Sequence, residues 1–134
     1  MEKEKVTVKT KAEALAKEIH NKGVASIQDL YFDTGSATIK PESKPALEEI
    51  AKFLRQEGEL NLYVVGHTDS SGDFEYNMTL SKNRAKTVVE TLVSDYGISR
   101  ERLEPHGVGC LAPTATNETE KGRAQNRRVE LVKP

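Results

Sequence analysis

Hydrophobic and polar residues alternate along the chain at spacings that predict regular secondary structure from about residue 11 onward. In residues 11–22, Leu15 and Ile19 share one stripe, which is typical of a short helix. Gly23 follows, and glycine commonly ends a helix. The charged residues 1–10, which include two alternating valines, predict either a short edge strand or a loose lead-in to that helix.

The next three segments predict a strand, a helix and a strand joined by short links. Residues 27–33 alternate in character and put Leu30 and Phe32 on the expected core face of a strand. Residues 41–57 begin with proline and carry apolar side chains at helical spacing, a strongly amphipathic pattern. Residues 60–66 are apolar enough for a central strand covered on both faces. This order predicts a right-handed β-α-β crossover.

The second half of the chain continues the same alternation. The longest helix is predicted at about residues 78–96, a strand at 103–108, a loop with one helical turn at 109–126, and a closing strand at 128–132. The whole pattern predicts an α+β fold in two layers, in which a mixed β-sheet carries its helices packed on one face.

Composition narrows the function classes. The 134 residues carry 20 Lys and Arg against 21 Asp and Glu, so the general basic surface of a nucleic-acid-binding protein is missing. A single cysteine, Cys110, cannot form an intrachain disulfide, and the three histidines lack zinc-ligand spacing, so we predict neither metal nor cofactor. No run approaches the ~20 apolar residues of a membrane-spanning helix, and the first residues lack the apolar core of a signal peptide. We therefore expect either a cytosolic protein or a piece of a longer exported one.

The polar loop after the predicted central strand is the most informative segment. Asp69 leaves the carboxyl end of that strand, where loops commonly carry function. Asn77 and Arg84 share one flank of the following helix, and Arg84 can point back toward the loop, because helical side chains lean toward the N-terminus. A carboxylate and a guanidinium held apart match the ammonium and the carboxylate of a zwitterionic ligand. On spacing alone, pairing of Asp69 and Arg84 with each other is the simpler alternative.

A hydrolase is the main alternative class of protein. His67 and Asp69 point the same way along an extended strand, and Ser70, Ser71 and Cys110 offer nucleophiles. A catalytic triad needs three members that converge from separate elements beside an oxyanion hole. Residues crowded within a few positions rarely meet that requirement. We therefore predict a non-enzymatic domain in which His67 orients the loop.

Three separated blocks of sequence resemble the C-terminal domain family of OmpA and MotB. The run GHTDSSGDFEYNMTLSKNRAKTVVETLV is similar to the family's signature of G-H-T-D, a Tyr-Asn pair and L-S-x-x-R-A. Upstream, YFDTGSATIKPES resembles the opening of these domains, and downstream GRAQNRRVEL resembles their ending. The resemblance covers about residues 27–132. It divides the chain into a lead-in with a short helix at 1–25 and an OmpA-like domain at 26–134.

The resemblance implies a β-α-β-α-β-β core that binds diaminopimelate in peptidoglycan stem peptides. It assigns the ligand ammonium to Asp69 and the ligand carboxylate to Arg84. The other positions that match the family's motifs are Asn77, Ser71, the turn of Asp33, Thr34 and Gly35, and either Arg127 or Arg128. Many family members carry Asn where this chain has Gly35. A backbone contact at that position would be kept, and a side-chain contact would be lost.

The same resemblance implies a place in the cell envelope. The expected partner is diaminopimelate-type peptidoglycan and not nucleic acid, and the resemblance allows a weak homodimer. The parent protein is expected to be anchored to a membrane through a segment outside this chain. The expected location is the periplasm, attached to the outer membrane, or to the inner membrane for a protein like a motor stator. A protein-docking role in an envelope complex is compatible with wall binding.

Overall fold

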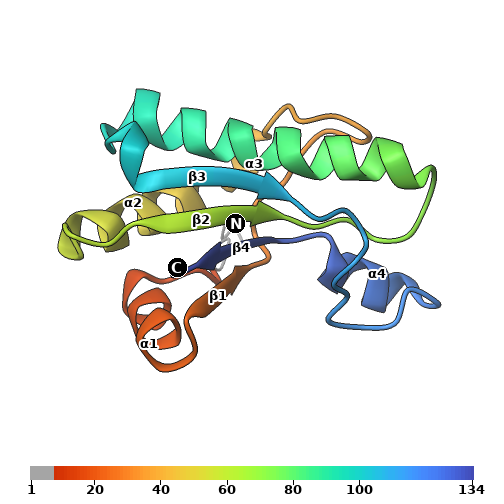
Figure 1. The fold of residues 1–134 in the computed structure, drawn as a ribbon, viewed down its shortest axis with the longest axis horizontal. Helices are drawn as coiled ribbons and strands as arrows, with labels where there is room; N and C mark the ends of the chain where they lie inside the picture. The colour runs from red at the N-terminus through yellow and green to blue at the C-terminus, as the bar shows by residue number, and fades with distance from the viewer. Residues whose placement is uncertain (1–7) are drawn as a thin grey trace, which may run out of the picture.

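The computed structural model describes residues 8–134. The helices are α1 (Ala12–Lys22), α2 (Lys44–Gln56), α3 (Phe74–Tyr96) and α4 (Glu120–Asn126), with short 3-10 turns at Pro41–Ser43 and Arg100–Arg102. The strands are β1 (Val24–Ile27), β2 (Leu62–Gly66), β3 (Leu103–Gly107) and β4 (Val129–Val132). Figure 1 shows a single sheet with α2 and α3 lying along it. The extended segment predicted within residues 1–10 falls mainly outside the described residues.

The sheet has the strand order β1-β4-β2-β3. The parallel neighbours β2 and β3 are joined by α3, while β4 runs antiparallel to β2 on one side and to β1 on the other. The last strand therefore separates the first two, which point the same way. From β1 onward the order is β-α-β-α-β-β, with the short α4 before the last strand. The predicted α+β fold with a mixed sheet is confirmed.

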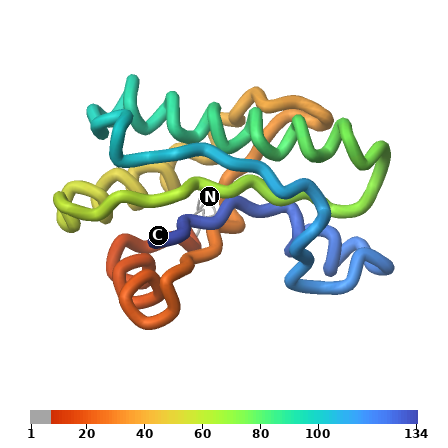
Figure 2. Tube along the Cα trace, in the orientation of Figure 1, coloured from red at the N-terminus to blue at the C-terminus, as the bar shows by residue number. Residues whose placement is uncertain are grey.

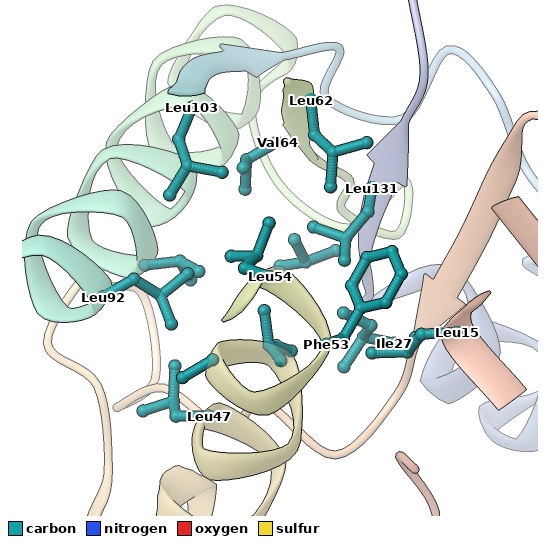
Figure 3. Close-up of a cluster of buried hydrophobic side chains, with 14 of the residues drawn as sticks. Leu15, Ile27, Leu47, Phe53, Leu54, Leu62, Val64, Leu92, Leu103 and Leu131 are labelled. Atoms are coloured by element: carbon teal, nitrogen blue, oxygen red, sulfur yellow. The ribbon is translucent and has the colours of Figure 1, made fainter. Parts of the chain in front are cut away.

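The hydrophobic core lies between the sheet and the helices α2 and α3. Alternate strand residues face it and are buried, among them Ile27, Leu62, Val64 and Leu131. Figure 3 shows Phe53 and Leu54 of α2 in the middle of this layer. Leu15 and Ile19 of α1 join the same cluster. The helix of the lead-in therefore shares one core with the rest of the described chain.

The strand predicted at residues 27–33 is wrong in its position. β1 ends where that segment begins, and within the segment Phe32 forms only an isolated bridge, with Ile39. In this segment a side chain makes hydrogen bonds to the backbone that a neighbouring strand would otherwise make. The Ser43 hydroxyl accepts from the Tyr31 N–H at 2.7 Å and donates to the Tyr31 carbonyl at 3.0 Å. Leu30 is buried as expected, whereas Phe32 is only half-buried.

Two helices are longer than predicted. The first, α3, begins at Phe74 because the Asp73 side chain caps it, accepting from the Tyr76 N–H at 2.9 Å. The second is α4, which was predicted as one helical turn around residues 121–124. Both helices border the loops that carry the predicted site.

Candidate functional site

One cavity of about 870 Å³ lies where the predicted site residues come together. It forms at the carboxyl end of β2, which is also the end where the antiparallel β4 begins. Three segments line it: the loop at 28–40, the loop at 66–72 with the start of α3, and residues 121–129. Figure 2 traces the first of these loops alongside α3. All of the predicted site residues except Asp33 line the cavity.

Asp69 is held at the cavity by two hydrogen bonds. Its side chain is 12% exposed; one carboxylate oxygen accepts the Ser71 N–H at 2.8 Å, and the other accepts from Arg127 Nη1 at 2.6 Å. Burial alone would raise the pKa of Asp69, but the bonds from Arg127 and Ser71 outweigh it and lower that pKa. The carboxylate is therefore ionised and fixed at neutral pH.

Arg84 reaches from α3 to the loop at 28–40. Its Nε donates to the Ser36 carbonyl at 2.8 Å, and its Nη2 donates to the Asp33 carbonyl at 3.3 Å. The guanidinium carbon lies 5.0 Å from the centre of the Phe32 ring, a cation–π distance. Burial lowers the pKa of Arg84, because the charged form loses hydration. Within residues 8–134 no carboxylate pairs with Arg84, so its alternative pairing with Asp69 does not occur.

Asn77 ties the loop after β2 to the first turns of α3. It is 6% exposed, and its Nδ2 donates to the Ser71 carbonyl at 2.8 Å. One residue earlier, the Tyr76 hydroxyl donates to the Gly35 carbonyl. Gly35 has a φ of 63°, in the left-handed region that favours glycine, and Thr34 precedes it in the same turn. Tyr76 also lines the cavity and was not selected from the sequence, although the Tyr-Asn pair signals it.

Arg127 and Arg128 take different places. Arg127 bonds to Asp69 and, through Nη2, to Glu120 at 2.7 Å. Arg128 is 6% exposed; its Nε donates to Glu130 at 3.0 Å, and its Nη2 donates to a loop carbonyl at 2.9 Å. Of the two, Arg127 has the more exposed side chain, 39% against 3% for Arg128, and is the one bonded to Asp69.

His67 is buried at the base of the Asp69 loop. Its Nε2 lies 3.3 Å from Glu130 Oε1, yet neither ring nitrogen has a well-aligned hydrogen-bond partner in the part of the chain that the structure describes. The His67 N–H donates to the Arg128 carbonyl at 2.9 Å and joins the end of β2 to the start of β4. The nearby His67 and the hydrogen bond from Arg128 outweigh burial and lower the pKa of Glu130 to about 2.

Glu130→Gln is expected to remove part of the acid sensitivity of folding. Since the pKa of Glu130 is about 2 in the folded state against an ordinary 4.5, its carboxylate stabilises the fold fully above pH ~4.5. That contribution is lost as the pH falls toward ~2, and it amounts to at most ~3 kcal/mol, because one pKa unit corresponds to about 1.4 kcal/mol.

Urea unfolding across this acidic range measures the effect. The free energy of unfolding of Glu130→Gln should change less with pH than that of the wild type, whereas the exposed Glu59→Gln should follow the wild type. Identical pH profiles for all three proteins would contradict this role of Glu130.

Of the hydrolase candidates considered from the sequence, His67, Asp69 and Ser71 line the cavity, and the other two nucleophiles do not. Among residues 8–134 there is no group of three or more His, Cys, Asp or Glu side chains arranged to hold a metal ion. Cys110 is half-buried in the loop after β3 and, like Ser70, does not line the cavity. No helix within the described range is long and apolar enough to cross a lipid bilayer.

Comparison with known sequences identifies related domains. The model of the OmpA family matches residues 31–127. The chain is 44% identical to the peptidoglycan-associated lipoprotein of Pseudomonas aeruginosa over 108 residues, which cover 81% of this chain and 63% of that protein. It is 40% identical to the probable lipoprotein YiaD of Escherichia coli over 104 residues, covering 78% of this chain and 47% of that protein. The chain thus spans about half to two thirds of the length of these relatives.

Solved structures share the fold. The cell wall anchor of the T6SS from Pseudomonas aeruginosa matches with a TM-score of 0.70 and 31% identity, over 95% of this chain and 98% of that chain. A putative MotB-like protein from Desulfovibrio vulgaris matches with a TM-score of 0.71 and 27% identity, over 81% and 70%. None of these relatives is named as an enzyme, in agreement with the predicted non-enzymatic class. Because the family model matches most of the chain and the two relatives above are 40% and 44% identical, the chain belongs to the OmpA family.

Proposed function

We propose that this domain binds peptidoglycan non-covalently through the diaminopimelate of stem peptides and thereby anchors an envelope protein to the cell wall. The observation that carries the proposal is the arrangement of Asp69 and Arg84. Both line one cavity, both are charged, and neither is paired with the other. An anion and a cation held apart on rigid elements match a ligand group that carries an ammonium and a carboxylate.

The ligand fit involves a third charge, that of Arg127. In the structure Asp69 already pairs with Arg127, and Arg84 and Arg127 repel each other electrostatically. A zwitterion whose ammonium binds Asp69 would place its carboxylate between the two guanidinium groups, each of which can bond a carboxylate with two parallel N–H groups. Such a ligand would relieve the repulsion and add an ion pair to the one already present.

The remaining contacts are polar and short-ranged. Asn77 fixes the loop at Ser71, so these two residues are proposed to complete the ammonium side of the site. On the carboxylate side, the backbone of Asp33, Thr34 and Gly35 is proposed to surround the ligand, since its carbonyls already orient Arg84 and Tyr76. Gly35 therefore serves through its backbone, and the lack of an Asn side chain there leaves the site complete.

The relatives' names support a place at the cell wall. One relative is named a peptidoglycan-associated lipoprotein, and one solved neighbour is described as a cell wall anchor. We infer a periplasmic domain whose parent protein is attached to the outer membrane, or to the inner membrane if it resembles the MotB-like neighbour. A weak homodimer and the role of residues 1–25 as a lead-in remain predictions of the sequence.

A selectivity measurement tests the proposed ligand. Soluble stem peptides that contain diaminopimelate should bind at least about 30-fold more tightly than matched peptides that contain lysine, since removing one partner of a desolvated charge pair costs ~2 kcal/mol or more. The lysine peptide lacks the extra carboxylate and leaves Arg84 unpaired. Calorimetric titration of the whole chain with both peptides gives the two dissociation constants. Equal constants would rule out the diaminopimelate assignment.

A further inference from the structure

The cavity wall is far more positive than the chain as a whole. The net charge of the chain is −1 at pH 7. Yet among residues 8–134 the only acidic residue that lines the cavity is Asp69, whereas the basic residues that line it are Lys9, Lys40, Arg84, Lys121, Arg127 and Arg128. A cavity concentrates the field of its lining charges, because part of the surrounding volume is protein and not water.

Half of these cations have no carboxylate partner within residues 8–134. The paired ones are Lys40 with Glu42, Arg127 with Asp69 and Glu120, and Arg128 with Glu130. Arg84 is already assigned to the diaminopimelate clamp, by which we mean the pair of Asp69 and Arg84 proposed above to bind the ligand ammonium and carboxylate. That assignment leaves Lys9 and Lys121 as the two basic side chains of the wall for which neither a carboxylate of the described residues nor the clamp provides an anion.

Lys9 and Lys121 belong to a different part of the wall from Arg84. Arg84 lies on α3, which packs on β2 and β3. Lys121 lies on α4, which leads into β4, and Lys9 is tied to the segment after β1 through its N–H, which donates to Asp29 at 3.1 Å. Gln28 of that segment reaches α4, because its side-chain amide donates to the Gln125 carbonyl at 3.4 Å. The two lysines therefore lie on the β1–β4 side of the cavity.

We propose that this β1–β4 side, with Lys121 and Lys9, binds a second carboxylate of the same stem peptide. The inference rests on the proposed function and deepens it: the ligand is a peptide with at least two free carboxylates, one at diaminopimelate and one on a neighbouring residue. Stem peptides carry such a group at the glutamyl α-carboxyl, which is either free or amidated. Amidation keeps the shape and removes the charge, so the domain discriminates between free and amidated cell walls.

The test uses two diaminopimelate-containing peptides that differ only in whether the glutamyl α-carboxyl is free or amidated. The whole chain should bind the free acid about two- to fivefold more tightly, because an exposed ion pair contributes up to ~1 kcal/mol and two lysines share the task. The Lys9→Gln, Lys121→Gln double variant should bind both peptides with the affinity that the wild type has for the amide. High salt should remove the preference in the wild type, since exposed charges are screened.

Lys52→Gln is the matched control, because Lys52 is an exposed lysine of α2 that does not line the cavity. This variant should keep the wild-type preference. Equal affinity of the wild type for both peptides, or a preference that survives in the double variant, would overturn the inference while leaving the diaminopimelate clamp intact. Binding of neither peptide would overturn the clamp and the second subsite together.

Discussion

Asp69→Asn is expected to abolish cosedimentation of the domain with isolated cell-wall sacculi. The substitution keeps the size of the side chain and removes its negative charge. It also keeps an oxygen that can accept the Ser71 N–H, which lies 2.8 Å from Asp69 Oδ1 in the wild type. The ligand ammonium then loses its counter-ion, and Arg127 loses the partner that lies 2.6 Å away. Removing one side of a desolvated charge pair costs ~2–5 kcal/mol, which weakens binding by roughly 30-fold to more than 1,000-fold.

A control variant and a folding measurement distinguish the loss of the ligand contact from unfolding of the domain. Glu101→Gln is a matched control, because Glu101 is an exposed acid in the 3-10 turn before β3, at the opposite end of the parallel pair β2–β3 from Asp69. It should bind sacculi like the wild type. Thermal unfolding should show that Asp69→Asn is still folded. A folded Asp69→Asn domain that still sediments with sacculi would remove the clamp from the mechanism.

Arg84→Lys examines the other half of the clamp. Lysine keeps the positive charge but lacks the planar fork that bonds the Ser36 and Asp33 carbonyls while presenting N–H groups to a ligand. We expect this variant to stay folded and to lose most of the preference for diaminopimelate over lysine peptides. The same titrations with both peptides measure it, and an unchanged preference would show that charge alone suffices at this position.

Gly66→Ala is expected to destabilise the fold by about 3 kcal/mol or more. A Cβ at Gly66 would lie 2.1 Å from the Ser81 carbonyl oxygen, which belongs to the backbone of α3 and cannot move aside as a side chain would. The helix would have to shift away from β2, and overpacking of a filled interface typically costs 1–3 kcal/mol before backbone displacement is added. Since domains are stable by only about 5–15 kcal/mol, part of the variant population would be unfolded at moderate temperature.

Gly58→Ala provides the comparison, because the nearest atom that its Cβ would meet is 4.0 Å away. Urea unfolding of the two variants gives the difference directly. Gly58→Ala should stay close to the wild type. If Gly66→Ala matched it, α3 would not approach the end of β2 as closely as described, and the position of Arg84 relative to Asp69 would need revision.

Much of the fold could be predicted, because helices and strands impose different hydrophobic periods. The position of β1 could not. The buried positions change from odd numbers in β1, at Ala25 and Ile27, to an even number at Leu30, so the alternation at 28–32 belongs to a separate segment and misplaces the strand. Beyond the end of β1, the Ser43 hydroxyl bonds to both backbone groups of Tyr31 from twelve residues away and holds this segment. A tertiary hydrogen bond of this kind leaves no mark in the alternation itself.

The candidate site, too, could be predicted only in part from the sequence. Asp69 and Arg84 could be singled out because one follows a strand and the other lies on a helix flank, both local features, and their ligand roles are implied by the resemblance to the OmpA and MotB domains. The bond between Asp69 and Arg127 joins residues 58 positions apart. It exists only because β4 inserts beside β2, which no short sequence window records. The sequence allows Arg84 as the counter-ion of Asp69, whereas in the structure Arg127 takes that place.

The place of β4 also sets the order in which the domain becomes complete during folding. It is the last strand in the chain but lies between β1 and β2, so β1 cannot join the sheet that β2 forms with β3 until residues 129–132 have been added. Arg127 immediately precedes that strand. Closing the sheet and bringing Arg127 to the cavity are thus a single event, and a partly synthesised chain would have an unfinished core and a cavity without this third charge.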